Sequence, residues 1–157
     1  FYTLFYFNFI QAKKNTSNNF WINALNSSLH KSWSGYAFEQ VCLLHIHEIK
    51  NALGIRGIIS SEASWRSQQK ADGAQIDLLI DRNDQIINVC EMKFSTTEFI
   101  ITKDYSKNLR NKIALFGAET QTKKAINLTL ITTYGVKENQ YAQDLIQNDI
   151  TIDCFFE

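Results

Sequence analysis

The sequence predicts an α/β domain with a mixed β-sheet and helices on both of its faces. Hydrophobic residues make up 45% of the 157 residues and aromatic residues 13%, which is enough for a substantial core. Apolar residues recur at helical spacing in some stretches and at the two-residue strand spacing in others. The resulting order is helix, three strands, helix, strand, helix, strand. This order is typical of a mixed sheet covered by helices.

The first half of this pattern begins with a long helix at residues 35–53. Ser34 suits its N-cap and Gly54 its C-cap, and the apolar residues between them recur at helical spacing. A four-residue polar sequence separates the second and third strands and indicates a β-hairpin. The three strands are expected at residues 55–61, 74–81 and 86–94.

The second half begins with a basic helical stretch at about residues 103–124, which we expect to break at Gly117. An apolar run then predicts a buried strand. The elements expected after the basic stretch are a strand at 128–135, a helix at about 138–147 and a last strand at 149–156.

Because the first residue is Phe1 and not Met, we expect the chain to be a piece of a longer protein or a processed product. The alternative is a complete short protein from which tags and disordered ends have been removed. We expect residues 1–32 to be an extension and residues 33–157 to form the main domain. The apolar opening covers only ten residues, which is too short to span a bilayer, and it lacks the features of a signal peptide. We therefore expect no membrane association.

The cysteine pattern argues against a disulfide framework and against a zinc ribbon. The chain has three cysteines at wide spacings and no Cys-x-x-Cys motif. Reduced thiols in a cytoplasmic protein fit this pattern best.

The charge distribution excludes a global basic field, since the formal net charge is zero. Any nucleic-acid surface must then be a local patch. Lys103, Lys107 and Arg110 recur at spacings of four and three on one face of the predicted basic helix. They are the candidates for contacts with a nucleic-acid backbone. The alternative is a solvated helix face.

Two carboxylates lie within the hydrophobic strands of the predicted hairpin. The two-residue period puts Asp77 on one face with Gln75, and Glu91 on one face with Lys93. A loop at residues 82–84 makes Asp77 and Glu91 diagonal neighbours on the same face. A slip of one residue would separate them.

Two carboxylates this close repel each other unless a cation neutralises their charge. Carboxylate oxygens are suitable ligands for Mg²⁺ or Mn²⁺. Lys93 can orient a water molecule and stabilise negative charge that develops on a phosphoryl group. Glu39, near the start of the first helix, would complete the site with Asp77 and Glu91. Gln75 would support Asp77. The alternative is a surface hairpin with ordinary charged residues.

The run GAQIDLLIDRNDQIINVCEMKFS at residues 73–95 resembles the core hairpin of the PD-(D/E)xK nuclease superfamily. The motif of that superfamily is an Asp, a strand turn and then Glu-x-Lys. Ile76 stands where the superfamily often has Pro, and Glu91, Met92 and Lys93 match Asp/Glu-x-Lys. The stretch GYAFEQVC supplies the Glu that the superfamily often carries on the preceding helix, Glu39.

This resemblance implies a restriction-endonuclease-like core with the order α-β-β-β-α-β. It implies that Asp77 and Glu91 ligate the metal with help from the Met92 carbonyl, and that Lys93 positions the attacking water. Glu39 would be the third acidic residue of the site.

The longer string WSGYAFEQVCLLHIHEIKNALGI, together with GAQIDLLIDR, is similar to the C-terminal nuclease-like domain of bacterial and archaeal AAA-type P-loop ATPases. The similarity implies an N-terminal ATPase domain in the full-length chain. No Walker A signature, GxxxxGK[ST], occurs in these 157 residues, so this chain is not expected to hydrolyse ATP.

Three functions remain open at this point. The first is a nuclease that hydrolyses DNA phosphodiesters with one or two Mg²⁺ or Mn²⁺ ions. The second is a catalytically silent module that binds nucleic acid or regulates the ATPase. The third is a protein-interaction domain in which the charges are structural.

Overall fold

The computed structural model describes residues 27–69 and 73–156, and these divide into two units that meet between Leu44 and His45. Helix α3, Ser28–Leu44, belongs to the first unit. The domain boundary expected after residue 32 falls inside this helix. The part of the expected extension at residues 1–26 lies outside the described residues.

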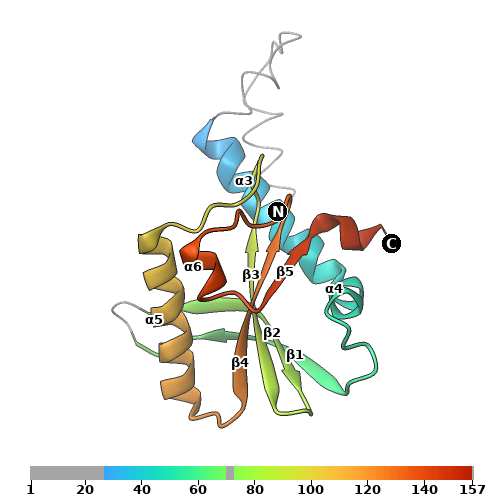
Figure 1. Ribbon diagram of the computed structural model, residues 1–157, viewed down its shortest axis with the longest axis vertical. Coiled ribbons are helices and arrows are strands. Elements are labelled where there is room, and N and C mark those ends of the chain that lie inside the picture. Colours follow the sequence, from blue (N-terminus) through green and yellow to red (C-terminus); the bar gives the residue numbers. More distant parts are fainter. Residues whose placement is uncertain (1–26, 70–72, 157) are drawn as a thin grey trace. The chain divides into compact units, whose positions relative to one another are not determined.

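A five-stranded mixed sheet forms the centre of the second unit, with the strand order β1-β2-β3-β4-β5 (Figure 1). Strand β2 is antiparallel to both of its neighbours, β1 and β3, whereas β3, β4 and β5 pair in parallel. The predicted α/β class with a mixed sheet is confirmed. The strands are β1 Ser60–Arg66, β2 Gln75–Arg82, β3 Ile86–Lys93, β4 Ala125–Thr132 and β5 Asn148–Thr151.

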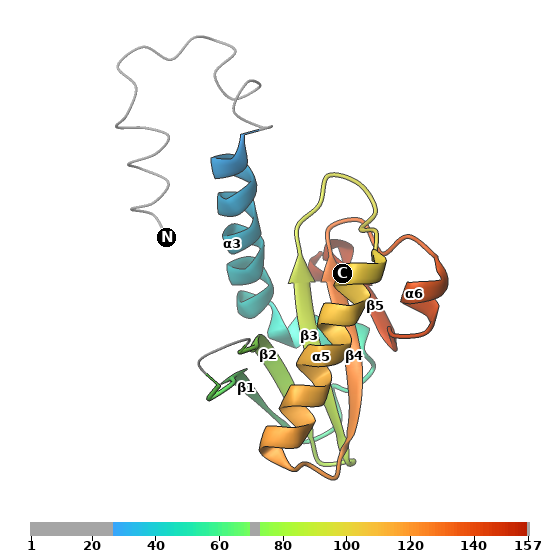
Figure 2. The ribbon, with the colours of Figure 1, turned by 90° about the vertical axis from the view of Figure 1, so that its left-hand side faces the viewer.

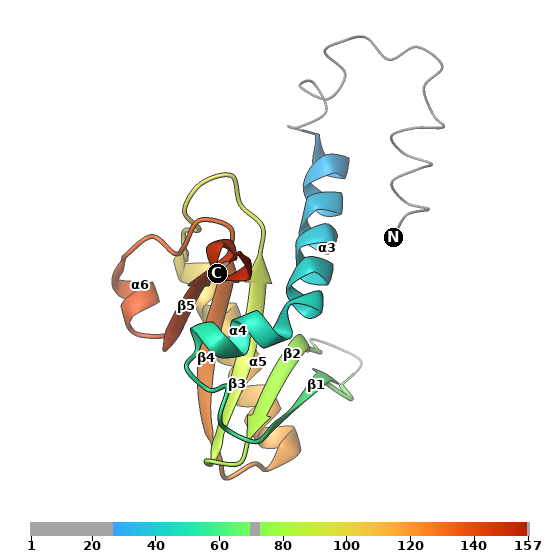
Figure 3. The same cartoon turned by 90° about the vertical axis from the view of Figure 1, so that its right-hand side faces the viewer.

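Helices cover both faces of this sheet. Helix α5, Lys103–Thr120, connects β3 to β4 and lies in front of the sheet in Figure 2. Helix α4, Ile46–Ala52, lies in front of the opposite face in Figure 3. The short helix α6, Gln140–Gln143, connects β4 to β5, and the 3-10 helix η2, Ile152–Phe155, follows β5.

The single helix predicted for residues 35–53 is wrong, because α3 and α4 are separate helices. The chain leaves the helical conformation at His45, which has φ −115° and ψ 32°. The predicted C-terminal end of the second helix at Gly54 is confirmed. Gly54 has φ 68°, its N–H donates to Asn51, and the N–H of Ile55 donates to Lys50. This is the double hydrogen bond of a Schellman cap, in which glycine adopts the left-handed conformation without a steric penalty.

The other predicted bounds differ most where the strands are polar or short. Strand β1 begins at residue 60 rather than 55, because it is an edge strand with mostly exposed side chains and lacks an apolar alternation. Helix α5 does not break at Gly117 but continues to Thr120 and ends at Gln121, whose φ is 51°. Strand β4 begins three residues earlier than predicted, α6 is shorter than the expected helix, and the expected last strand is split between β5 and η2.

The hairpin of β2 and β3 has a different register from the predicted one. Leu79 pairs with Val89 and Asp81 pairs with Ile87, whereas the expected loop paired Asp81 with Gln85. The loop consists of residues 83–85, and Gln85 has φ 67°. A three-residue hairpin loop commonly ends on such a left-handed residue. Because the shift is two residues, it exchanges no side chains between the faces.

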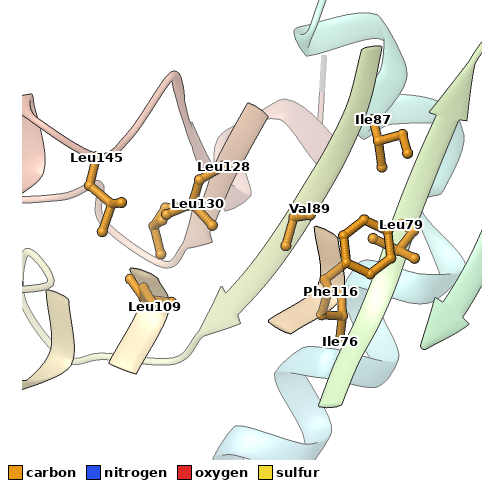
Figure 4. Close-up of a cluster of buried hydrophobic side chains, with 9 residues drawn as sticks. All are labelled: Ile76, Leu79, Ile87, Val89, Leu109, Phe116, Leu128, Leu130 and Leu145. Atoms are coloured by element: carbon orange, nitrogen blue, oxygen red, sulfur yellow. The ribbon is translucent and has the colours of Figure 1, made fainter. Parts of the chain in front are cut away.

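The core between α5 and the sheet is apolar (Figure 4). Phe116 of α5 lies beside Leu79 and Ile76 of β2, and its ring meets the edge of Trp65 at 5.3 Å between ring centroids. This packing fixes α5 against the strands that carry the candidate site. The buried residues of the cluster are Ile76, Leu79, Ile87, Val89, Leu109, Phe116, Leu128, Leu130 and Leu145.

Candidate active site at one edge of the sheet

The candidate residues of the hairpin lie at one end of the neighbouring strands β2 and β3. Glu91 and Lys93 are near the C-terminal end of β3, and Asp77 is near the N-terminal end of β2. Since the two strands are antiparallel, these ends meet at the same edge. Leu78 and Cys90 form the pair nearest to it. Ligand sites in sheets with parallel strands commonly lie at the carboxyl ends of those strands, which is where β3 and β4 end.

Glu91 is a buried carboxylate with three donors, and 8% of the residue is exposed. Its Oε1 lies 2.8 Å from Lys93 Nζ and accepts a hydrogen bond of 3.1 Å from the Tyr105 hydroxyl. Its Oε2 accepts a hydrogen bond of 2.6 Å from Lys112 Nζ. We call these four residues the Glu91 cluster. Such pairing is what a buried charge needs, because an unpaired one carries a large desolvation penalty.

Helix α5 supplies two of these donors, and neither was identified from the sequence. The Thr102 side chain accepts a hydrogen bond of 3.2 Å from the Tyr105 N–H and so caps the helix at its first turn. Tyr105 and Lys112 are seven residues apart, which places them on the same face two turns apart. The seven-residue spacing was the only sequence signal for these two residues. It could not show that they contact Glu91, because that contact depends on how α5 packs on the sheet.

The charges of the Glu91 cluster follow from its surroundings. Burial alone raises the pKa of Glu91, but the nearby ammonium groups of Lys93 and Lys112 outweigh burial, and the net result is a lowered pKa. Burial and the adjacent Glu91 both raise the pKa of Tyr105, so the phenol keeps its proton. At neutral pH, one carboxylate therefore faces two ammonium groups.

This lowered pKa predicts an acid-dependent loss of stability. The contribution of the ionised Glu91 to the free energy of unfolding is fully present above the unfolded-state pKa of 4.5. It is lost as the pH falls through the lower folded-state pKa. We expect the unfolding free energy of wild type relative to Glu91→Gln to fall as the pH drops below 4.5. Urea unfolding at a series of pH values measures this difference. Glu138→Gln, at an exposed glutamate, is the matched control. The prediction would be contradicted if the difference in unfolding free energy between wild type and Glu91→Gln stayed constant or grew in acid.

Asp77 and Gln75 form a second pair at the same edge. Gln75 Nε2 donates to Asp77 Oδ1 at 2.5 Å, and Gln75 also accepts a hydrogen bond from Arg66. This is the support that the sequence predicted for Asp77. Among the described residues, no hydrogen bond or ion pair joins Asp77 to Glu91.

Strand β2 is irregular at Asp77. It has one more residue than β1 between the pairs Ala63–Leu79 and Trp65–Ile76, which indicates a β-bulge at Asp77 and Leu78. Ile76 and Leu79, three residues apart, both belong to the core cluster. Simple alternation therefore does not determine the face to which Asp77 points, and the shared metal ion stays a prediction.

The donor chemistry of the hairpin fits a hard divalent cation, because Asp77 and Glu91 offer carboxylate oxygens. Both oxygens of Glu91 already have partners, with Lys93 and Tyr105 at Oε1 and Lys112 at Oε2, so a metal would share this carboxylate with two ammonium groups or replace one of them. In the described part of the second unit, residues 45–69 and 73–156, no three His, Cys, Asp or Glu side chains are grouped as a metal site.

The remaining predicted site residues lie on two helices. Glu39 is in α3, in the first unit of the chain. Lys103, Lys107 and Arg110 are all exposed on α5. Their side chains are therefore accessible for the predicted contacts with nucleic acid.

No family model, curated protein or solved structure matches the chain. Within residues 27–69 and 73–156, none of the helices has the length and apolar character needed to cross a bilayer.

Proposed function

We propose that the chain contains a PD-(D/E)xK nuclease-like domain that hydrolyses DNA phosphodiesters and forms the C-terminal part of a AAA-type ATPase. The observation that carries the proposal is the Glu91–Lys93 pair at the carboxyl end of β3, beside the start of β2 with Asp77. The strand order supports a restriction-endonuclease-like core, because three antiparallel strands continue into a strand parallel to β3 through helix α5.

Each residue has a separate role in this proposal. Asp77 and Glu91 would hold Mg²⁺ or Mn²⁺, which lowers the pKa of a bound water and polarises the phosphoryl oxygen when present. Lys93 orients the attacking water and stabilises the negative charge that develops at phosphorus. Gln75 holds the carboxylate of Asp77 through its amide. The exposed cations of α5, Lys103, Lys107 and Arg110, contact the DNA backbone.

The test is a plasmid-cleavage assay on the purified chain. With Mn²⁺ we expect supercoiled plasmid to be converted to nicked or linear DNA, and we expect EDTA to stop the conversion. A preparation that is folded by circular dichroism but leaves the plasmid intact in Mg²⁺ and in Mn²⁺ would rule out hydrolysis by this chain.

A catalytically silent module is the second candidate, and the three donors that already contact Glu91 favour it. Two ammonium groups and a phenol already occupy both oxygens of this carboxylate. If these contacts persist with metal present, the cluster is structural, and the domain binds nucleic acid or regulates the ATPase without turnover. Such a module shows salt-dependent DNA binding and no cleavage.

Titration with Mn²⁺ separates the two candidates without reference to activity. A nuclease site should bind Mn²⁺, and Asp77→Asn should weaken that binding. Binding is measured as the loss of the electron paramagnetic resonance signal of the free ion. For a silent module we expect no difference between wild type and Asp77→Asn.

A further inference from the structure

A cavity of about 590 Å³ lies beside the Glu91 cluster, and its lining includes Gln75 and Lys112, which contact Asp77 and Glu91. Its walls come from α5 and from the chain that enters β2. The size lies within the range of sites that bind small molecules or single nucleotides. The lining residues are Gly73, Ala74, Gln75, Asn108, Asn111, Lys112 and Leu115.

The lining has an unusual chemical make-up. Among the described residues, the lining includes three carboxamides, Gln75, Asn108 and Asn111, one ammonium group, Lys112, and no acidic residue. Asn108, Asn111 and Lys112 follow one another at helical spacing, so they present one face of α5 to the cavity. Carboxamides offer a donor and an acceptor side by side, which matches the hydrogen-bonding edge of a nucleobase.

Lys112 links the cavity to the candidate site. The residue lines the cavity, and its ammonium lies 2.6 Å from Glu91 Oε2. Because Glu91 also pairs with Lys93, the cluster has two ammonium groups and one carboxylate, and the second nearby carboxylate, Asp77, is bonded to Gln75 rather than to Lys112. An anionic group of a ligand is therefore favoured at the end of the cavity nearest to Lys112.

We infer that this cavity binds one unpaired nucleotide of single-stranded DNA, with its phosphate at Lys112 and its base edge at the carboxamides of Asn108 and Asn111. The inference rests on the proposed function and deepens it by naming the strand type that reaches the site. The depth of the cavity, rather than its carboxamides, favours a single strand, because a base can enter it only when the base is not paired and stacked in a duplex.

The test is DNA binding in EDTA, where no metal-dependent cleavage can consume the probe. Fluorescence anisotropy is measured with a labelled single strand of about 12 nucleotides, a length close to known single-strand site sizes, and with its duplex. We expect the single strand to bind more tightly than the duplex. Asn111→Leu should weaken single-strand binding about tenfold, as expected for the loss of about 1.4 kcal/mol.

Matched controls separate the cavity from general surface effects. Asn51→Leu replaces an exposed asparagine on α4 and should leave binding unchanged. Lys112→Met should weaken single-strand binding, whereas Lys137→Met, at an exposed lysine, should not. Thermal unfolding of each variant shows whether the fold is retained.

The outcomes distinguish this inference from the proposed function. Equal affinity for the single strand and the duplex, or unchanged single-strand binding by Asn111→Leu, would overturn the cavity assignment. Manganese-dependent plasmid cleavage by the same wild-type preparation would then leave the nuclease proposal intact. A wild type that neither binds DNA nor cleaves it would refute both.

Discussion

Replacing Lys93 with methionine should reduce Mn²⁺-dependent plasmid cleavage about 100-fold or more, if the domain is a nuclease. Methionine keeps much of the length of the side chain but removes the ammonium for which we propose the roles of orienting water and stabilising developing charge. The loss of one such group typically costs two to four orders of magnitude in rate, or about 10²–10⁴-fold. Initial rates of nicking at saturating Mn²⁺ measure the effect. Asp77→Asn should lower the rate by a similar factor, since a neutral amide oxygen attracts a divalent cation less strongly than a carboxylate does.

The fold should survive these substitutions. Lys93→Met leaves Glu91 with the Lys112 ammonium and the Tyr105 hydroxyl. The controls are Lys137→Met and Asp84→Asn, at an exposed lysine and at an aspartate in the hairpin loop, far along β2 and β3 from the candidate edge. Both controls should cleave at the wild-type rate. Full activity in Lys93→Met and Asp77→Asn would remove the proposed roles of these residues.

Replacing Phe116 with alanine should destabilise the chain by about 3–5 kcal/mol, the usual cost of truncating a buried phenylalanine. Only 3% of Phe116 is exposed, and its ring packs against Ile76, Leu79 and Trp65 between α5 and the sheet. For a chain of this size, the loss corresponds to a fall of about 10 °C in melting temperature. Urea unfolding monitored by circular dichroism measures the free energy directly.

Phe156→Ala is the matched control, because 83% of Phe156 is exposed. We expect its unfolding free energy to differ from that of wild type by at most about 0.5 kcal/mol, as is usual for surface substitutions. Similar losses in both variants would contradict the assignment of Phe116 to the core. Since α5 also carries Tyr105 and Lys112, Phe116→Ala should weaken single-strand binding as well if α5 loosens.

Strong local patterns made part of the fold predictable. The hydrophobic strands on either side of a short polar loop predicted the β2–β3 hairpin to within one residue at each strand end. Gly54 marked the end of α4, because its left-handed conformation is a backbone requirement that glycine meets without strain. The exposed edge strand β1 was displaced in the prediction, since exposed residues have no reason to alternate.

The candidate site was predictable only in its hairpin residues. Glu91 and Lys93 could be paired from their two-residue spacing, and the structure brings them within 2.8 Å. Lys112 is 21 residues from Glu91 in the chain, and its contact with the carboxylate depends on how α5 crosses the sheet. A sequence pattern that repeats every two or four residues has no information about such a contact.

The sequence alone determined the α/β class, the hairpin and the acidic and basic residues at its open end, because side-chain period and turn chemistry are local properties of the chain. Only the tertiary structure decided the register of that hairpin, the bulge at Asp77 and the enclosure of Glu91 by Lys93, Lys112 and Tyr105. These features depend on packing between distant segments. Burial in that packing also makes the surrounding cations decisive for the charge of Glu91.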